Sequence, residues 1–215
     1  MNLPNYISLT RIFSVPVLIW ILTSSTFSSV HGQRELLASA VFIAASITDG
    51  IDGYLARKRG QITTMGMLLD PLADKLMIAA AFITLVEFNP HIVSAWIAVV
   101  IIGREFLVSG LRSIAASEGF TIEASDLGKF KMVVQIVTVV TAILDHRWHE
   151  WNLRGFILPI DVIARLAVWF MVTISLVSAI DYFAGFWVRI DRHVTQRQRR
   201  RGFVLRRRKR DVPAV

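Results

Sequence analysis

Six long apolar stretches constrain the fold of this chain more than any other feature of its sequence. Each approaches the length of about 20 residues that a helix needs to cross the hydrocarbon core of a bilayer, and clusters of polar residues, Gly and Pro separate one stretch from the next. The stretches lie at residues 6–28, 35–58, 66–88, 92–114, 129–145 and 161–187. The pattern predicts an all-α polytopic membrane protein, folded as a six-transmembrane-helix bundle.

The composition excludes the main alternatives. Hydrophobic residues make up 54% of the 215 residues and charged residues only 19%. In a typical soluble domain, hydrophobic residues make up about 45–50% and charged residues about a quarter. Such a chain is neither disordered nor collagen-like, and the lack of cysteine rules out a disulfide scaffold. No internal repeat is visible, so we expect one membrane domain over residues 1–188 and a basic cytoplasmic tail over residues 189–215.

Positive charge is concentrated in that tail. Between Arg189 and Asp211, eleven Arg and Lys residues and two acids give a net charge of +9, so the other residues carry −1 of the total of +8. The tail and the Arg57–Arg59 loop should face the cytoplasm. An even number of spans, six, then places both termini on the cytoplasmic side. We therefore expect a multi-pass protein of the cell (inner) membrane. The basic tail could bind nucleic acid or anionic lipid headgroups. Because it directly follows a span, we expect it to bind lipid headgroups and no nucleic acid.

Four carboxylates interrupt the apolar pattern. Asp49 and Asp52 fall near the end of the second stretch, and Asp70 and Asp74 near the start of the third. Acids within a membrane are costly and usually mark function. Helical spacing places each pair on one stripe of its helix, and we expect both stripes to face one polar cavity that opens to the cytoplasm. The small residues that share these stripes are Gly53, Ala56 and Gly66.

Four neighbouring carboxylates repel one another unless cations lie between them. A set of carboxylate ligands without His or Cys suits Mg²⁺ or Mn²⁺ rather than Zn²⁺. Two such ions can neutralise a diphosphate during displacement at phosphorus, and Arg57 can bind a phosphate through two hydrogen bonds. In the alternative interpretation some acids pair with Arg57 or Lys75, or lie in water near the membrane surface. Four acids on two matching stripes favour the metal site.

Read in order, these residues form the motif Asp49-x2-Asp52-Gly53-x2-Ala56-Arg57-x8-Gly66-x3-Asp70-x3-Asp74. The motif resembles the signature of the CDP-alcohol phosphatidyltransferase family, whose members displace CMP from a CDP-linked lipid with the hydroxyl group of a second substrate. The resemblance implies CDP-diacylglycerol as the donor, two divalent cations (Mg²⁺ or Mn²⁺) as cofactors, and a homodimer. It also implies site roles: metal ligands at Asp49, Asp52, Asp70 and Asp74, the base at Asp74, and CDP-lipid contacts at Gly53, Arg57 and Thr63, beside the small Ala56 and Gly66.

Basic residues in the fourth and fifth stretches bear on the second substrate. They are Arg104, Arg112, Lys129 and Lys131, all expected on the side of the acids. A cationic pocket beside a dimetal site suits an acceptor that carries its own phosphate. The alternative is pairing with Glu105 and Asp126, or anchoring at the membrane surface. We favour the phosphate pocket because bidentate phosphate recognition needs such clustering.

Other segments resemble a bacterial subgroup of the same family that uses sn-glycerol 3-phosphate as the acceptor. They are Asn2–Asn5 with Thr10-Arg11, Gly103–Arg112, and Gly128–Lys131 with Gln135. Met132 stands where that subgroup commonly has Thr, and the Arg-rich tail is longer than its usual carboxyl end. Two other classes stay open: a sibling enzyme that uses inositol phosphate, serine or phosphatidylglycerol, and a cation or proton transporter.

Overall fold

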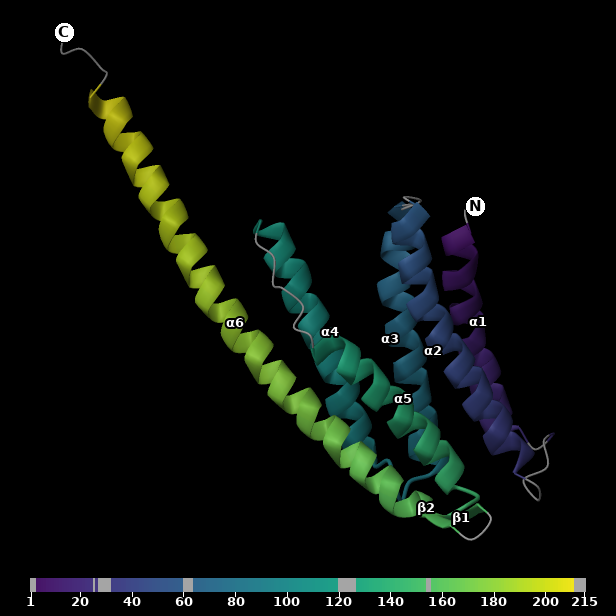
Figure 1. The fold of residues 1–215 in the computed structure, drawn as a ribbon. Helices are drawn as coiled ribbons and strands as arrows, with labels where there is room; N and C mark the ends of the chain where they lie inside the picture. Colours follow the sequence, from purple (N-terminus) through teal and green to yellow (C-terminus); the bar gives the residue numbers. More distant parts are fainter. Residues whose placement is uncertain are drawn as a thin grey trace.

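The structure is a computed structural model. It describes the backbone of residues 3–24, 26, 32–59, 64–119, 127–153 and 156–210, and the side chains of residues 9–24, 26, 32–48, 72–119, 132–152 and 157–190. These residues form six α-helices and one β-hairpin (Figure 1). The elements are α1 (Leu3–Thr23), α2 (Gln33–Arg59), α3 (Thr64–Phe88), α4 (Ala95–Ser117), α5 (Leu127–Asp145), β1 (Glu150–Leu153), β2 (Phe156–Pro159) and α6 (Ile160–Arg210).

Each predicted apolar stretch overlaps one helix, which confirms the mostly helical architecture. The hairpin between α5 and α6 was not expected from the sequence. In it β1 pairs antiparallel with β2, and Trp151 lies opposite Leu158. An alternating polar and apolar segment, Glu150–Leu153, and an apolar segment, Phe156–Pro159, flank Arg154-Gly155 in the sequence, and this pattern is a hairpin signal. The signal was missed because the connection was interpreted only as a polar separator between two spans.

α6 also differs from expectation. It runs without a break from Ile160 to Arg210, so the basic tail begins inside a helix rather than after one. No Pro occurs between Pro159 and Pro213, so the sequence contains no strong helix breaker there. Figure 1 shows the carboxyl half of α6 projecting beyond the other helices.

The helices pack as a closed ring. Around it, α1 contacts α3, α3 contacts α4, α4 contacts α6, α6 contacts α5, α5 contacts α2, and α2 contacts α1. α2 and α3 follow one another in the chain, yet across the described residues each contacts α1 more than it contacts the other. A short connection brings two helix ends together, but apolar packing selects the partners. Leu18 of α1 is buried in one core with Phe42 of α2 and Phe82 of α3.

All six helices also expose large apolar side chains. The exposed fractions lie between 54% and 69% for one residue on each helix: Phe13, Ile47, Ile83, Val99, Val133 and Ile180. Soluble proteins rarely leave so much apolar surface uncovered, whereas a bilayer accepts it on every side. Within the described side chains, one helix, Ile160–Ile190 of α6, is long and apolar enough to cross a membrane.

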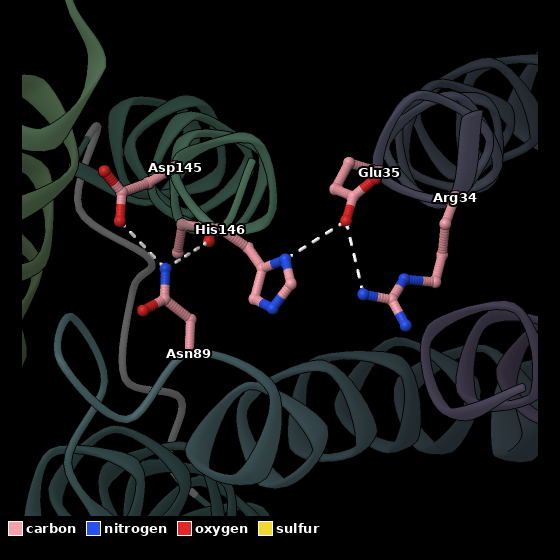
Figure 2. A network of polar contacts seen from close by, with 6 residues as sticks. Arg34, Glu35, Asn89, Asp145 and His146 are labelled. Carbon is pink, nitrogen blue, oxygen red and sulfur yellow. Dashed lines mark hydrogen bonds and ion pairs between the residues drawn. The ribbon is translucent and has the colours of Figure 1, made fainter. Parts of the chain in front are cut away.

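A buried polar network joins α2, α3 and α5 at the hairpin end of the bundle (Figure 2). The Glu35 side chain is fully buried. Its Oε1 accepts a hydrogen bond from Arg34 Nη2 at 3.4 Å and lies 3.1 Å from His146 Nδ1. Beside it, Asn89 Nδ2 donates to Asp145 Oδ2 at 2.9 Å. These contacts hold three helix ends together at the end of the bundle opposite the acidic motif.

Replacing Glu35 with Gln should lower the free energy of unfolding by about 2 kcal/mol, because Arg34 and His146 lose a buried carboxylate partner. Thermal unfolding in detergent should show a lower midpoint than that of the wild type. Asp161→Asn is the matched control, since it removes a partly exposed i,i+4 pair with Arg165 (2.8 Å) that contributes about 0.5 kcal/mol at most. Equal midpoints for the two variants would contradict a stabilising role for the Glu35 network.

Candidate active site

The four acids of the motif lie at one end of the bundle. Asp49 and Asp52 are in the second half of α2, and Asp70 and Asp74 are in the first half of α3. Figure 1 shows the end of α2 and the start of α3 together, opposite the hairpin. Because both helices are continuous, the spacings of three and four residues keep each pair on one face. Asp74 is exposed, and the side chains of the other three lie outside the described ranges.

The predicted CDP-lipid residues lie on the same two helices. Gly53, Ala56 and Arg57 are on α2 and Gly66 is on α3, each placed by the backbone alone, while Thr63 lies outside the described residues. Helix geometry therefore retains the predicted stripes. The contacts of these residues with a nucleotide stay a prediction.

A small cavity lies among α1, α2, α3 and α5, next to the acids. Its volume is about 20 Å³, enough for one water-sized group. The residues that line it are Arg11 of α1, Ala45 and Ser46 of α2, Asp74, Met77 and Ile78 of α3, and Met132, Gln135 and Ile136 of α5. Asp49 follows Ala45 by four residues and so lies on the same face of α2, one turn nearer the helix end. The cavity is therefore one turn deeper in the bundle than Asp49.

Arg11 lines this cavity, although the sequence analysis gave it no site role. Its side chain is only 3% exposed, and a buried guanidinium requires polar or anionic surroundings. The signal was present, because Arg11 is the one charged residue of the first apolar stretch. Its position beside Asp74 could not be read from the sequence, since 63 residues separate the two.

Comparison with known proteins identifies the family. Residues 1–177 match CDP-alcohol phosphatidyltransferase. The chain belongs to this family. The CDP-diacylglycerol–glycerol-3-phosphate 3-phosphatidyltransferase of Bacillus subtilis (strain 168) is 40% identical, over 86% of this chain and 95% of that protein. The protein of the same name from Rickettsia bellii is 32% identical over 85% and 93%. A cardiolipin synthase (CMP-forming) of Oryza sativa subsp. japonica is 33% identical over 79% of this chain and 56% of its own length.

CDP-alcohol phosphatidyltransferases are membrane enzymes that use divalent metal ions, and the residues of this chain fit that requirement. Four acidic residues lie on two helices toward one end of the bundle, and oxygen-only donors suit hard divalent cations. Within the described side chains there is no group of three or more His, Asp or Glu residues placed to hold a metal. Three of the four motif acids lie outside those ranges, so the fit rests on their chemistry and their backbone positions.

The two arginines of the predicted phosphate pocket both contact α6. Arg104 Nη1 donates to Glu105 Oε1 at 3.1 Å, and its Nη2 donates to Ser178 Oγ. Arg112 Nη2 donates to the Tyr182 hydroxyl at 2.7 Å, and the guanidinium carbon lies 5.4 Å from the ring centroid of Tyr182. The guanidinium groups are thus positioned by hydroxyl groups from a helix about 70 residues further along the chain.

The structure leaves the role of the basic residues as a prediction. The ion pair of Arg104 with Glu105 is the one that the pairing interpretation expected. Lys129 and Lys131 lie in the first turns of α5, with side chains outside the described ranges. Arg112, Lys129 and Lys131 lie in the halves of α4 and α5 nearest the acidic end, whereas Arg104 lies just before the middle of α4.

Cavity size alone would point to a different place. A cavity of about 610 Å³ lies at the hairpin end, lined by residues that include Asn89, Asp145, His146, Asp161 and Arg165. Several of them belong to the network of Figure 2, and the motif acids occupy the opposite end. The family motif therefore places the candidate active site at the acidic end.

Proposed function

We propose that this chain transfers a phosphatidyl group from CDP-diacylglycerol to sn-glycerol 3-phosphate, with phosphatidylglycerophosphate and CMP as products. The observation that carries the proposal is the 40% identity to the CDP-diacylglycerol–glycerol-3-phosphate 3-phosphatidyltransferase of Bacillus subtilis, over 95% of the length of that protein. The four acids at one end of the bundle support it, because they supply the ligands that the chemistry requires.

The reaction is an in-line displacement at phosphorus. Asp74 accepts the proton of the primary hydroxyl of glycerol 3-phosphate. The hydroxyl oxygen bonds to the phosphorus that carries diacylglycerol, and the bond from that phosphorus to the oxygen of CMP breaks. Asp49, Asp52, Asp70 and Asp74 would hold two divalent cations, Mg²⁺ or Mn²⁺, which when bound neutralise the diphosphate and the leaving phosphate.

The remaining residues of the motif position the donor. Gly53, Ala56 and Gly66 leave space along the two stripes, so a nucleotide can approach the backbone. Arg57 binds a phosphate oxygen through its planar guanidinium, and Thr63 contacts the CDP portion. With the acyl chains in the bilayer, binding energy is used to align the reacting atoms.

Arg104, Arg112, Lys129 and Lys131 would bind the phosphate of the acceptor. The contacts with Ser178 and Tyr182 support this assignment, because they orient two guanidinium groups before any ligand arrives. Preorganised cations bind a phosphate with less loss of side-chain entropy than mobile ones.

The proposal includes an arrangement in the cell (inner) membrane. Residues 1–188 would cross it six times, with the cavity and both termini on the cytoplasmic side, and the tail from residue 189 would contact anionic headgroups and no nucleic acid. The apolar side chains exposed on all six helices support the six crossings. Figure 1 also shows the carboxyl end of α6, the end of α2 and the start of α3 on the same side of the bundle. Two copies would form a homodimer.

Release of CMP by the detergent-purified protein tests the proposed function. CDP-diacylglycerol and Mg²⁺ or Mn²⁺ would be supplied with one acceptor at a time: glycerol 3-phosphate, glycerol, inositol phosphate, serine or phosphatidylglycerol. We expect release with glycerol 3-phosphate and little with glycerol, since only the former carries the phosphate that the basic residues would bind.

Other outcomes would redirect the proposal. Release with phosphatidylglycerol alone would indicate cardiolipin synthesis, the activity for which the rice relative is named. This result would be consistent with the dimetal site but would remove the acceptor assignment. Silence with every acceptor, from protein shown to be folded, would favour a cation or proton transporter.

A further inference from the structure

Gln135 has a buried amide donor without a partner in the described part of the chain. The residue is 7% exposed and lines the small cavity beside Asp74, and its Nε2 has no hydrogen-bond partner there. Leaving a buried donor unsatisfied costs about 1–3 kcal/mol. Such a cost is retained where a bound group satisfies the donor during function.

The size of the cavity limits what that group can be. A volume of about 20 Å³ admits one oxygen with its hydrogen, but not a phosphate or a nucleobase. Met77, Ile78, Met132 and Ile136 form apolar parts of the wall, so a small polar group would be recognised by only a few contacts.

The polar part of the wall offers both hydrogen-bond roles. Gln135 Nε2 and the guanidinium of Arg11, which also lines the cavity, are donors. Ser46 Oγ already donates to the Phe42 carbonyl at 2.8 Å, which leaves its lone pairs as acceptors, and the ionised carboxylate of Asp74 only accepts. A hydroxyl group, which donates and accepts at once, complements this wall.

We propose that Gln135 determines acceptor specificity by donating a hydrogen bond to the secondary hydroxyl, at C2, of glycerol 3-phosphate. This inference rests on the proposed function, in which Asp74 takes the proton of the neighbouring primary hydroxyl. The C2 hydroxyl is on the carbon next to the one that bears the attacking oxygen. When the primary hydroxyl is bound at Asp74, the C2 hydroxyl is therefore brought to the cavity that Asp74 shares with Gln135. Glycerol 3-phosphate would thus be recognised at two groups: the basic residues would bind its phosphate, and Gln135 would bind its C2 hydroxyl.

A deoxy acceptor tests the inference. 3-Hydroxypropyl phosphate keeps the primary hydroxyl and the phosphate but lacks the C2 hydroxyl. With the wild type, kcat/KM for glycerol 3-phosphate should exceed that for the deoxy acceptor by about tenfold or more, the effect of one buried hydrogen bond. In Gln135→Met, which keeps the side-chain length and removes the donor, this ratio should fall to within about threefold.

Two further variants separate specificity from folding. Gln135→Glu replaces the donor with an acceptor of the same shape and should also lose the preference. Thr138→Val is the matched control: Thr138 is buried one turn further along α5, bonded to the carbonyls of Val134 and Ala167, and outside the cavity lining. Its ratio should equal that of the wild type. The thermal midpoint of Gln135→Met should be equal to or above the wild-type value, because an unsatisfied donor has been removed.

The outcomes distinguish this inference from the proposed function. A wild type that uses both acceptors equally, or Gln135 variants that keep the wild-type ratio, would overturn the role of Gln135 while the transfer reaction stands. A wild type that releases CMP with neither acceptor would remove the proposed function and this inference with it.

Discussion

Asp74→Asn should reduce CMP release from CDP-diacylglycerol and glycerol 3-phosphate by about 1,000-fold or more. A positioned general base contributes about 10²–10⁴-fold to such a rate, and the amide also removes the negative charge of one of the four proposed metal ligands. Asn has the size and shape of Asp, so the wall of the cavity that Asp74 lines with Met77 and Ile78 is preserved. Initial rates of the purified variant, with metal and both substrates saturating, measure the effect.

Asp161→Asn serves again as the control, since it changes an acid at the opposite end of the bundle and should leave the rate unchanged. The thermal midpoint of Asp74→Asn should stay close to that of the wild type. Turnover within tenfold of the wild type would eliminate Asp74 as the base and move that role to another acid of the motif.

Removal of divalent cations should stop turnover completely, and Mg²⁺ or Mn²⁺ should restore it. Without cations, the carboxylates on the two stripes repel one another and the diphosphate of the donor has too little positive charge opposite it. The loss should therefore exceed that of any single substitution in the basic pocket. The measurement is CMP release after chelation and dialysis, followed by titration with each metal.

A second measurement does not depend on activity. Metal added to the chelated protein should raise the thermal midpoint, because a ligand that binds only the folded state stabilises it. Asp70→Asn should weaken that stabilisation, whereas Asp161→Asn should not. Full activity in excess chelator would contradict the dimetal proposal.

The positions of the helices, and the pairs of acids that share a helix face, can be predicted from the sequence because they depend on residues close together in the chain. The apolar stretches predict the helices, since a helix in a bilayer needs a minimum length and internal hydrogen bonds. The placement of Asp49 with Asp52, and of Asp70 with Asp74, follows from helical periodicity alone. In both cases the decisive residues are close together along the chain.

The structure was needed where distant residues meet. Arg11, Asp74 and Gln135 line one cavity only because α1, α3 and α5 converge, and nothing in their spacing indicates this. Likewise, the bond from Arg112 to Tyr182 spans 70 residues. The choice of α1 rather than α3 as the main partner of α2 depends on how Leu18 and Phe42 fill the core together, which is a property of packed volumes and not of periodicity.

The unbroken length of α6 has a geometric consequence for the tail. At about 1.5 Å per residue, the part beyond Ile190 would extend roughly 30 Å from the bilayer if the helix stayed straight, several times the screening length of about 8 Å in physiological salt. Tail arginines that bind headgroups therefore require α6 to bend where it leaves the membrane. Because Ser178 and Tyr182 lie on the same helix, the helix that carries the basic tail also orients Arg104 and Arg112, the two arginines proposed to bind the phosphate of the acceptor.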